Sequence, residues 1–329
     1  MNKETLARIL VIVLVAAAAA IPLAGYFLTP ILGVKTIELH ARMAENGGWS
    51  LDTIQAVVGQ PVHLRLTSDD VMHSFAIGKS DQAPIDIVPG EMVETTLNFD
   101  KPGTYTFYCT HWCGANHWRM RGTIEVSGPG PASTKEPQPL FLKLGLDVDM
   151  VIPAEVTPAA LPSSGHGAQF ASLLPAYATA QETYLTSSPA QLWQRLRAEP
   201  GLASVSDTDL WDAVAFAWLS QTSPEKLAAA QKLYSTNCAA CHGEAGKGDG
   251  VMVRGLPVID YQNHQAMAEQ RVRPPDFTDP KNLLGTSPAL LEGKMIRGGM
   301  GTGMPYWGPI FTQQQLGELV SYIYTFVLK

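Results

Sequence analysis

Residues 9–28 form an unbroken run of 20 residues without a charged side chain. At about 1.5 Å per residue, a helix of this length spans roughly 30 Å, which is the thickness of the hydrocarbon core of a bilayer. Lys3 and Arg8 precede the run, and basic residues favour the cytoplasmic side of a membrane. The sequence therefore predicts one transmembrane anchor, with the amino terminus in the cytoplasm and the remaining chain outside.

A cleaved signal peptide is the alternative interpretation of this segment, with cleavage after the alanines at 16–20. Apolar residues continue beyond those alanines, through Ile21, Leu23 and Phe27. A signal peptide does not need this extra length, so we favour the membrane anchor.

The length of the chain bears on the number of its domains, and its net charge bears on the kind of partner it can bind. The chain has 329 residues, enough for several domains that each bury a core. It carries 23 basic and 30 acidic side chains, which gives a net charge of −7 at pH 7. Phosphate recognition requires a basic surface, so this balance argues against nucleic acid as a partner.

The segment 36–128 has the pattern of short β-strands. Apolar and polar residues alternate at 62–66 and 92–97, as in strands with one buried face. Turn-forming Pro-Gly pairs occur at 89–90 and 102–103. Short strands at this spacing predict an all-β sandwich.

A loop in the same segment is rich in soft metal ligands. Cys109 and Cys113 lie four residues apart, and His117 and Met120 follow them. Thiolate, thioether and imidazole groups favour copper over magnesium or calcium. A mononuclear blue-copper site uses one cysteine, so the second cysteine indicates two sulfurs that bridge two copper ions. A further histidine has to come from upstream, and His73 is the candidate.

The run 68–75 and the loop 108–120 resemble subunit II of the haem–copper cytochrome c oxidases. This resemblance implies a cupredoxin-like fold and a dinuclear CuA centre. Many oxidases have a glutamate where this chain has His111, and that glutamate helps to hold a magnesium ion, so a magnesium site is in doubt. A disulfide in the loop is the alternative, but it leaves the histidine and methionine unexplained. The copper ligands implied by the resemblance are His73, Cys109, Cys113, His117, Met120 and the backbone carbonyl of His111.

The middle of the chain differs in composition from both ends. The segment 129–170 contains seven prolines and predicts a semi-extended linker. The segment 171–222 has a helical pattern, in which Ser206 is placed to cap a helix with Asp209 at the third position. The stretch 206–214 is similar to the terminal helix of a cytochrome c domain, but no Cys-x-x-Cys-His precedes it. A haem-free cytochrome remnant and plain helical packing against the next domain are the two interpretations.

Cys238, Cys241 and His242 form a Cys-x-x-Cys-His sequence, the signature of c-type haem attachment. The two thiols would form thioethers with the haem, and the adjacent histidine would then be held under the iron. A thioredoxin-like cysteine pair is the competing interpretation, but it gives no reason for the histidine. Met/His ligation suits electron transfer. We predict Met304 as the sixth ligand, with Met300 as the alternative.

The segment 223–329 resembles a class I cytochrome c, which implies an all-α fold. The Gly-Met-Pro-aromatic-x-Gly stretch at 303–308 carries this resemblance together with the haem attachment motif. Ser223 and Thr312 are placed to cap helices. In this family a proline carbonyl commonly accepts a hydrogen bond from the haem-ligating histidine, and the candidates are Pro257, Pro274 and Pro275.

A haem c domain behind a CuA domain resembles subunit II of the caa-type oxidases, many of which have two membrane spans rather than one. The resemblance implies a multidomain chain with one transmembrane helix, an all-β domain and an all-α domain. The predicted domains are the cytoplasmic tail and anchor at 1–35, the cupredoxin domain at 36–128, the linker at 129–170, the helical segment at 171–222 and the cytochrome c domain at 223–329.

The implied function is that of an electron-transfer subunit in the respiratory chain of a bacterial inner membrane. Electrons from cytochrome c or another donor would pass through haem c and CuA to the haem–copper subunit I, which reduces oxygen to water. Both centres are predicted to be coordinatively closed, which suits electron transfer, so we predict no catalytic residue in this chain. The equivalent subunit of a nitric oxide reductase is the alternative, and a free-standing periplasmic electron carrier or copper-binding protein is a third possibility.

Overall fold

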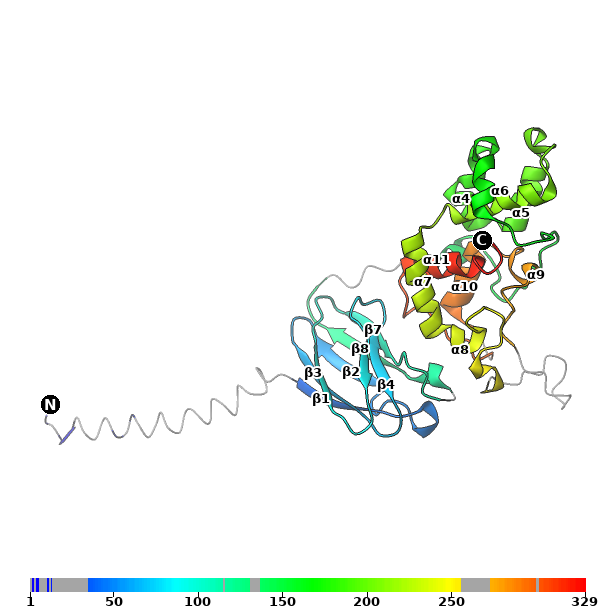
Figure 1. Cartoon of the computed structure of the whole chain (residues 1–329). Helices are drawn as coiled ribbons and strands as arrows, with labels where there is room; N and C mark the ends of the chain where they lie inside the picture. The colour runs from blue at the N-terminus through cyan, green and yellow to red at the C-terminus, as the bar shows by residue number, and fades with distance from the viewer. Residues whose placement is uncertain are drawn as a thin grey trace.

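The computed structural model shows a β-domain followed by a helical domain (Figure 1). The anchor predicted at 9–28 lies almost wholly outside the residues that the structure describes. Within the described part of the chain, no helix has the length and apolar character needed to cross a membrane. The described residues are 35–114, 116–130, 137–255, 273–299 and 302–329, together with 2, 4, 5, 11 and 13.

The β-domain consists of two sheets. In the first sheet, β3 (Val62–Ser68) lies between β1 (Lys35–Ala41), to which it is parallel, and β6 (Val93–Leu97), to which it is antiparallel. The strands predicted at 62–66 and 92–97 are thus confirmed. The second sheet has the order β2-β8-β7-β4-β5. Its strands are β2 (Thr53–Val57), β4 (His73–Ile77), β5 (Ile85–Ile87), β7 (Gly103–Tyr108) and β8 (Arg121–Ser127).

Alternating burial builds the core between the two sheets. Along β3, every second residue from Val62 onward is buried, as a strand with one solvent-facing side requires. Phe75 and Phe107 stack in the interior at 5.4 Å between ring centroids, and Trp49 meets both rings edge-on. Every residue of the short strand β4 is buried, so the side chain of its first residue, His73, is shielded from solvent.

The helical domain begins within the proline-rich segment. Phe141 and Val148 pack against Leu290, and Lys294 donates hydrogen bonds to the carbonyls of Val148 and Met150 at 2.7 and 2.8 Å. Phe141 and Val148 of the predicted linker are therefore packed against α10 (Pro288–Arg297), whereas Val151 and Leu161 of the same segment are exposed. The short helices of this segment are α2 (Leu140–Lys143) and α3 (Ser164–Gly167).

The predicted helix caps of this domain are confirmed. The hydroxyls of Ser206, Ser223 and Thr312 each accept a hydrogen bond from the backbone N–H three residues later. These caps satisfy backbone donors that the first helical turn leaves free. The remaining helices are α4 (Gln181–Thr186), α5 (Pro189–Arg197), α6 (Asp207–Leu219), α7 (Pro224–Asn237), α8 (Ala239–His242), α9 (Pro280–Leu283), α10 (Pro288–Arg297) and α11 (Gln313–Tyr324).

Residues 171–222 share one hydrophobic core with the carboxyl-terminal helices. Trp218 of α6 meets Tyr324 of α11 edge-on at 5.7 Å, and the hydroxyl of Tyr184 is hydrogen-bonded to that of Ser321 at 2.9 Å. The segment is thus packed helix on helix against the next domain. Whether it is also a haem-free cytochrome remnant stays a prediction.

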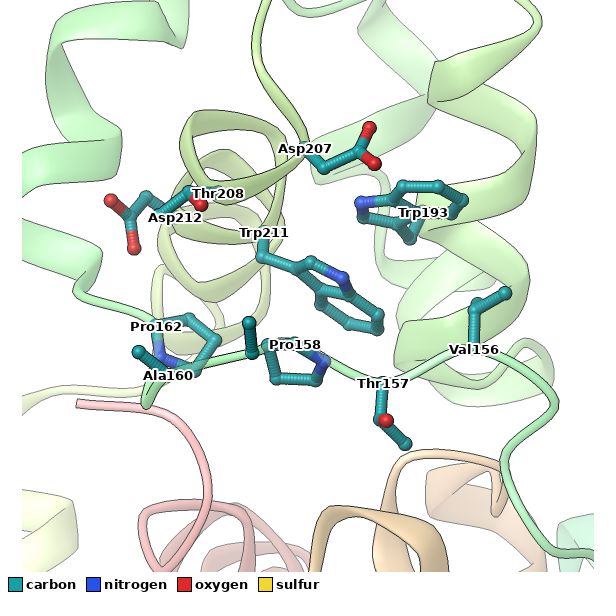
Figure 2. Close-up of a pocket in the computed structure, with 11 residues that line it drawn as sticks. Val156, Thr157, Pro158, Ala160, Pro162, Trp193, Asp207, Thr208, Trp211 and Asp212 are labelled. Carbon is teal, nitrogen blue, oxygen red and sulfur yellow. The ribbon is translucent and has the colours of Figure 1, made fainter.

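A pocket of about 270 Å³ lies at the outer end of this helical segment. Its wall includes the stacked indoles of Trp193 and Trp211, whose centroids are 5.7 Å apart. Figure 2 shows Trp211 extending from α6 toward the chain stretch that carries Pro158. The pocket is remote in sequence from every residue predicted to bind copper or haem.

Candidate copper and haem sites

Strand pairing brings the predicted copper ligands to one end of the second sheet. β7 pairs antiparallel with β4 and with β8, and Tyr108 faces Arg121 in the register of β7 and β8. Cys109 follows β7 directly and Met120 precedes β8, and the Cys109 N–H donates to the Met120 carbonyl at 3.1 Å. His73 begins β4, so it lies at the same end of the sheet.

Two of the predicted ligand atoms surround the sulfur of Cys109. Nδ1 of His73 lies 3.8 Å from this sulfur, and the carbonyl oxygen of His111 lies 3.3 Å from it. The potential ligand atoms of His73, Cys109 and Cys113 all lie within 4.8 Å of one another. The backbone N–H of Ser74 also donates toward the Cys109 sulfur at 3.4 Å.

The remaining predicted ligand atoms surround the sulfur of Cys113. Nδ1 of His117 lies 3.3 Å from it, and the sulfur of Met120 lies 3.2 Å from it. Both cysteines of the loop are buried and free, so the alternative disulfide is not formed. The structure thus gathers all six predicted donor atoms into one cluster, in which His73, Cys109, Cys113 and Met120 are buried, while their role as copper ligands stays a proposal.

The two neighbouring thiols do not ionise independently. Hydrogen bonding from Cys113, followed by the hydrogen bonds of His117 and His73, lowers the pKa of Cys109 although burial opposes this shift. The same pairing raises the pKa of Cys113 far above its usual range. Two adjacent sulfurs cannot both carry a negative charge without a compensating cation. Copper ions would provide that charge, and soft sulfur and imidazole donors are the ones copper prefers, so the donor set fits the metal.

Asp70 is a residue of this site that sequence reasoning missed. Its carboxylate lies 2.8 Å from Nε2 of His73 and also accepts from the backbone N–H of Met43 at 2.7 Å. Burial opposes the charged form of His73, but its hydrogen bonds to Cys109 and Asp70 hold its pKa above the usual range. A carboxylate three residues before a candidate histidine ligand was the signal available in the sequence.

The side chain of His111 points away from the sulfurs. Its Nε2 lies 2.8 Å from a carboxylate oxygen of Asp86. Among the described residues, the His111 imidazole belongs to no group that could hold a metal ion. The carbonyl of His111 therefore faces the sulfur of Cys109, while its ring is hydrogen-bonded to Asp86 at the surface.

The haem attachment motif folds as a single helical turn. Cys238 ends α7, and its carbonyl accepts from the N–H groups of Cys241 and His242 at 3.1 and 2.9 Å. Residues three apart on such a turn lie on the same side, so both thiols can reach one ligand. The cysteines are free, which excludes the thioredoxin-like disulfide in this structure.

The environment of His242 fits an iron ligand. Its ring stacks on Phe277 at 4.9 Å, and burial lowers its pKa to about 4, so the ring is neutral at pH 7. Its Nδ1 is buried and has no hydrogen-bond partner among the described residues. Neither Pro274 nor Pro275 accepts a hydrogen bond from it, and Pro257 lies outside the described residues.

Met304 lies in the loop between α10 and α11. Its carbonyl accepts from the N–H of Gly299 at 3.1 Å, and its half-buried side chain packs against the core of the helical domain, as does Cys238. The alternative ligand Met300 lies outside the described residues. The assignment of Met304 as the sixth ligand stays a proposal.

Two family models match the chain. Residues 50–127 match the periplasmic domain of cytochrome c oxidase subunit II, and residues 227–326 match cytochrome c. Two separate segments of this chain thus resemble two families, the first segment a subunit II domain and the second cytochrome c. The family resemblance stated from the sequence is thereby confirmed, as are the two cofactors that the domains imply, haem c and dinuclear copper.

Individual relatives match the subunit II domain. Two proteins of Thermus thermophilus, both named cytochrome c oxidase subunit 2, are 32% identical over 79 residues, which is 24% of this chain. The matched part is 58% of one relative and 46% of the other, so the chain spans about half the length of these relatives.

Solved structures similar to this chain include oxidase and blue-copper proteins. The periplasmic domain of oxidase subunit II from Bradyrhizobium japonicum is 21% identical, with 29% of this chain and 84% of that chain covered and a TM-score of 0.24. A chain of a haem–copper terminal oxidase dimer is 23% identical, with 38% and 100% covered and a TM-score of 0.26. Auracyanin A of Chloroflexus aurantiacus is 19% identical, with 29% and 100% covered and a TM-score of 0.24.

Proposed function

We propose that this chain is the electron-input subunit, subunit II, of a respiratory cytochrome c oxidase. It would bring electrons from cytochrome c or another donor to the haem–copper subunit that reduces oxygen to water. The observation that carries this proposal is the cluster of two thiols, one thioether, two imidazoles and one carbonyl at one end of the subunit II domain, in the same chain as a haem attachment turn. Bound copper and haem c would supply one-electron redox chemistry.

The chain's own residues hold the two groups in place. Cys109, Cys113, His73, His117, Met120 and the carbonyl of His111 would hold the copper ions. Most of these groups come from strand ends or from a tight loop between strands, so the protein resists a change of geometry when the charge changes. In the cytochrome c domain, Cys238 and Cys241 would attach the haem, and His242 and Met304 would bind its iron.

We also propose that the chain is a single-pass protein of a bacterial inner membrane. The uncharged run at 9–28 and the basic residues before it support an anchor with a cytoplasmic amino terminus. The match to a periplasmic domain supports an extracytoplasmic place for everything after the anchor.

The copper end of the subunit II domain offers a surface for the catalytic subunit. Val71, Met72 and Trp112 are 37%, 43% and 42% exposed, and each lies within two residues of a proposed copper ligand in the sequence. The Trp112 ring meets His117 edge-on at 5.6 Å. Apolar side chains gathered around a buried redox site suit docking against a protein partner.

Substitution of one bridging cysteine tests the proposal. In the intact, detergent-solubilised complex fed with reduced cytochrome c, Cys109→Ser should abolish oxygen consumption and leave haem attachment unchanged. His63→Gln is the matched control, because His63 lies in the same domain and, among the described residues, is hydrogen-bonded only to Thr96 across the sheet. Normal oxygen consumption in Cys109→Ser would refute the proposed function. Faster consumption of nitric oxide than of oxygen by the wild-type complex would also refute it.

A further inference from the structure

One arginine side chain joins the two domains next to both proposed redox sites. Arg121 follows Met120 directly, and its Nη1 donates to the carbonyl of Tyr306 at 2.6 Å. The guanidinium also lies over the rings of Tyr306 and Trp307, at 4.8 and 5.2 Å from their centroids. These two residues follow Met304, the proposed haem ligand, by two and three positions.

The partners of Arg121 are unusual for a cation. The side chain is partly buried, and within the described part of the chain no carboxylate forms an ion pair with it. Its charge is met by a backbone carbonyl and two aromatic faces, all supplied by the cytochrome c domain. A planar guanidinium can stack and donate at the same time, which a lysine ammonium cannot reproduce.

A second contact lies beside the first one. The N–H of Lys79 donates to the carbonyl of Ile310 at 2.7 Å, and Gly78 lies so close to Pro309 that an added Cβ would sit 2.5 Å from its carbonyl oxygen. Tyr108, the residue before Cys109, packs against the core of the helical domain between these contacts. We call residues 78–79, 108 and 121 together with 306–310 the docking surface.

We propose that Arg121 positions the Met304 loop against the copper-ligand loop, and that electrons cross between the two domains of this chain at that contact. The inference rests on the proposed function, because it assumes that both sites are loaded. Covalent bonds and one hydrogen bond connect the two proposed ligands Met120 and Met304. Met120 is bonded to Arg121, the Arg121 side chain donates to Tyr306, and only Pro305 lies between Tyr306 and Met304 in the sequence. In the step one electron leaves the ferrous haem iron, which is oxidised, and reduces the copper pair, without proton transfer or bond cleavage.

The test uses the full chain carrying both groups and the variant Arg121→Gln. Light-driven reduction of the haem, followed by the absorbance of the copper pair, gives the rate of electron transfer within the chain. Amide hydrogen exchange at Lys79 reports docking independently, because its acceptor belongs to the other domain. The amide of Gly78 is an internal reference, since it donates to Thr106 within the subunit II domain. Losing a hydrogen bond from a charged donor should slow electron transfer and speed Lys79 exchange by about tenfold each.

Two further variants make the test specific. Gly78→Ala should produce both effects through its clash with Pro309, without touching Arg121 or any proposed ligand. Arg65→Gln removes the same charge from an exposed site in the same domain and should change neither quantity. Unchanged electron transfer in Arg121→Gln would overturn the inference, whether or not Lys79 exchange accelerates. The electron-transfer and exchange rates are measured on this chain without a catalytic subunit. The proposed oxidase function is tested separately, by oxygen consumption of the intact complex, so the two proposals can fail independently.

Discussion

The carboxylate of Asp70 lies 2.8 Å from Nε2 of His73, while the other ring nitrogen of this histidine lies 3.8 Å from the sulfur of Cys109. The histidine is completely buried, so its orientation depends on these two contacts. A carboxylate behind a ligating histidine fixes the ring and the position of its proton. Asp70 thereby turns Nδ1 toward the sulfur cluster.

Asp70→Asn should weaken copper binding by about 10- to 100-fold, because the His73 ring loses the carboxylate that orients it. Competition with a copper chelator measures this affinity, and haem attachment should be unchanged. Asp69→Asn is the matched control, since the Asp69 carboxylate binds His40 and Arg42 on the surface. Equal copper affinity in both variants would show that Asp70 does not orient the ligand.

Met304→Leu should leave the haem covalently attached but remove the proposed sulfur ligand. Because Met/His ligation raises the reduction potential, a redox titration should give a lower potential for the variant. The absorption of the ferric haem should also lose its sulfur-to-iron band. Met300→Leu serves as the control and should keep both properties. If only Met300→Leu produced these changes, Met300 rather than Met304 would be the sixth ligand.

Glu292→Gln should stabilise the protein at neutral pH. Burial raises the pKa of Glu292 above its usual value of 4.5, although Gln313 donates to it at 2.7 Å. The carboxyl of Glu292 binds a proton more tightly in the folded state than in the unfolded state. The free energy of unfolding of the wild type is therefore undiminished below the unfolded-state pKa of Glu292 and falls as the pH rises through its folded-state pKa. Urea unfolding from pH 4 to pH 8 should show a gain that grows with pH and disappears at about pH 4. Glu182→Gln at an exposed position is the matched control, and an equal gain in both variants would contradict this prediction.

Gly167→Ala should destabilise the helical domain by about 1–3 kcal/mol, since an added Cβ would collide with the backbone carbonyl of Asp212 on α6. Thermal unfolding of the full chain measures this effect. Gly165→Ala adds the same methyl group to the same short helix, where the nearest atom lies 3.9 Å away, and should be nearly neutral. Equal melting temperatures would mean that α3 does not pack closely on α6 in solution.

Local features of this protein follow from the sequence alone. The caps at Ser206, Ser223 and Thr312 link residues three positions apart, so their geometry is set within one turn. The attachment turn at 238–242 and the ligand-rich loop at 109–120 are local in the same way. Residues that lie only a few positions apart can adopt few arrangements relative to one another. For this reason residue type and spacing predicted the two cofactors.

Other features arise only when distant segments pack together. His73 lies near the sulfur of Cys109, 36 residues downstream, only because strand pairing brings both residues to the same end of the sheet. The predicted linker folds onto α10 because apolar side chains are buried there, which proline content does not reveal. Arg121 and Tyr306 are 185 residues apart. No local sequence pattern predicts their hydrogen bond, because it forms only when the folded β-domain and the folded helical domain pack against each other.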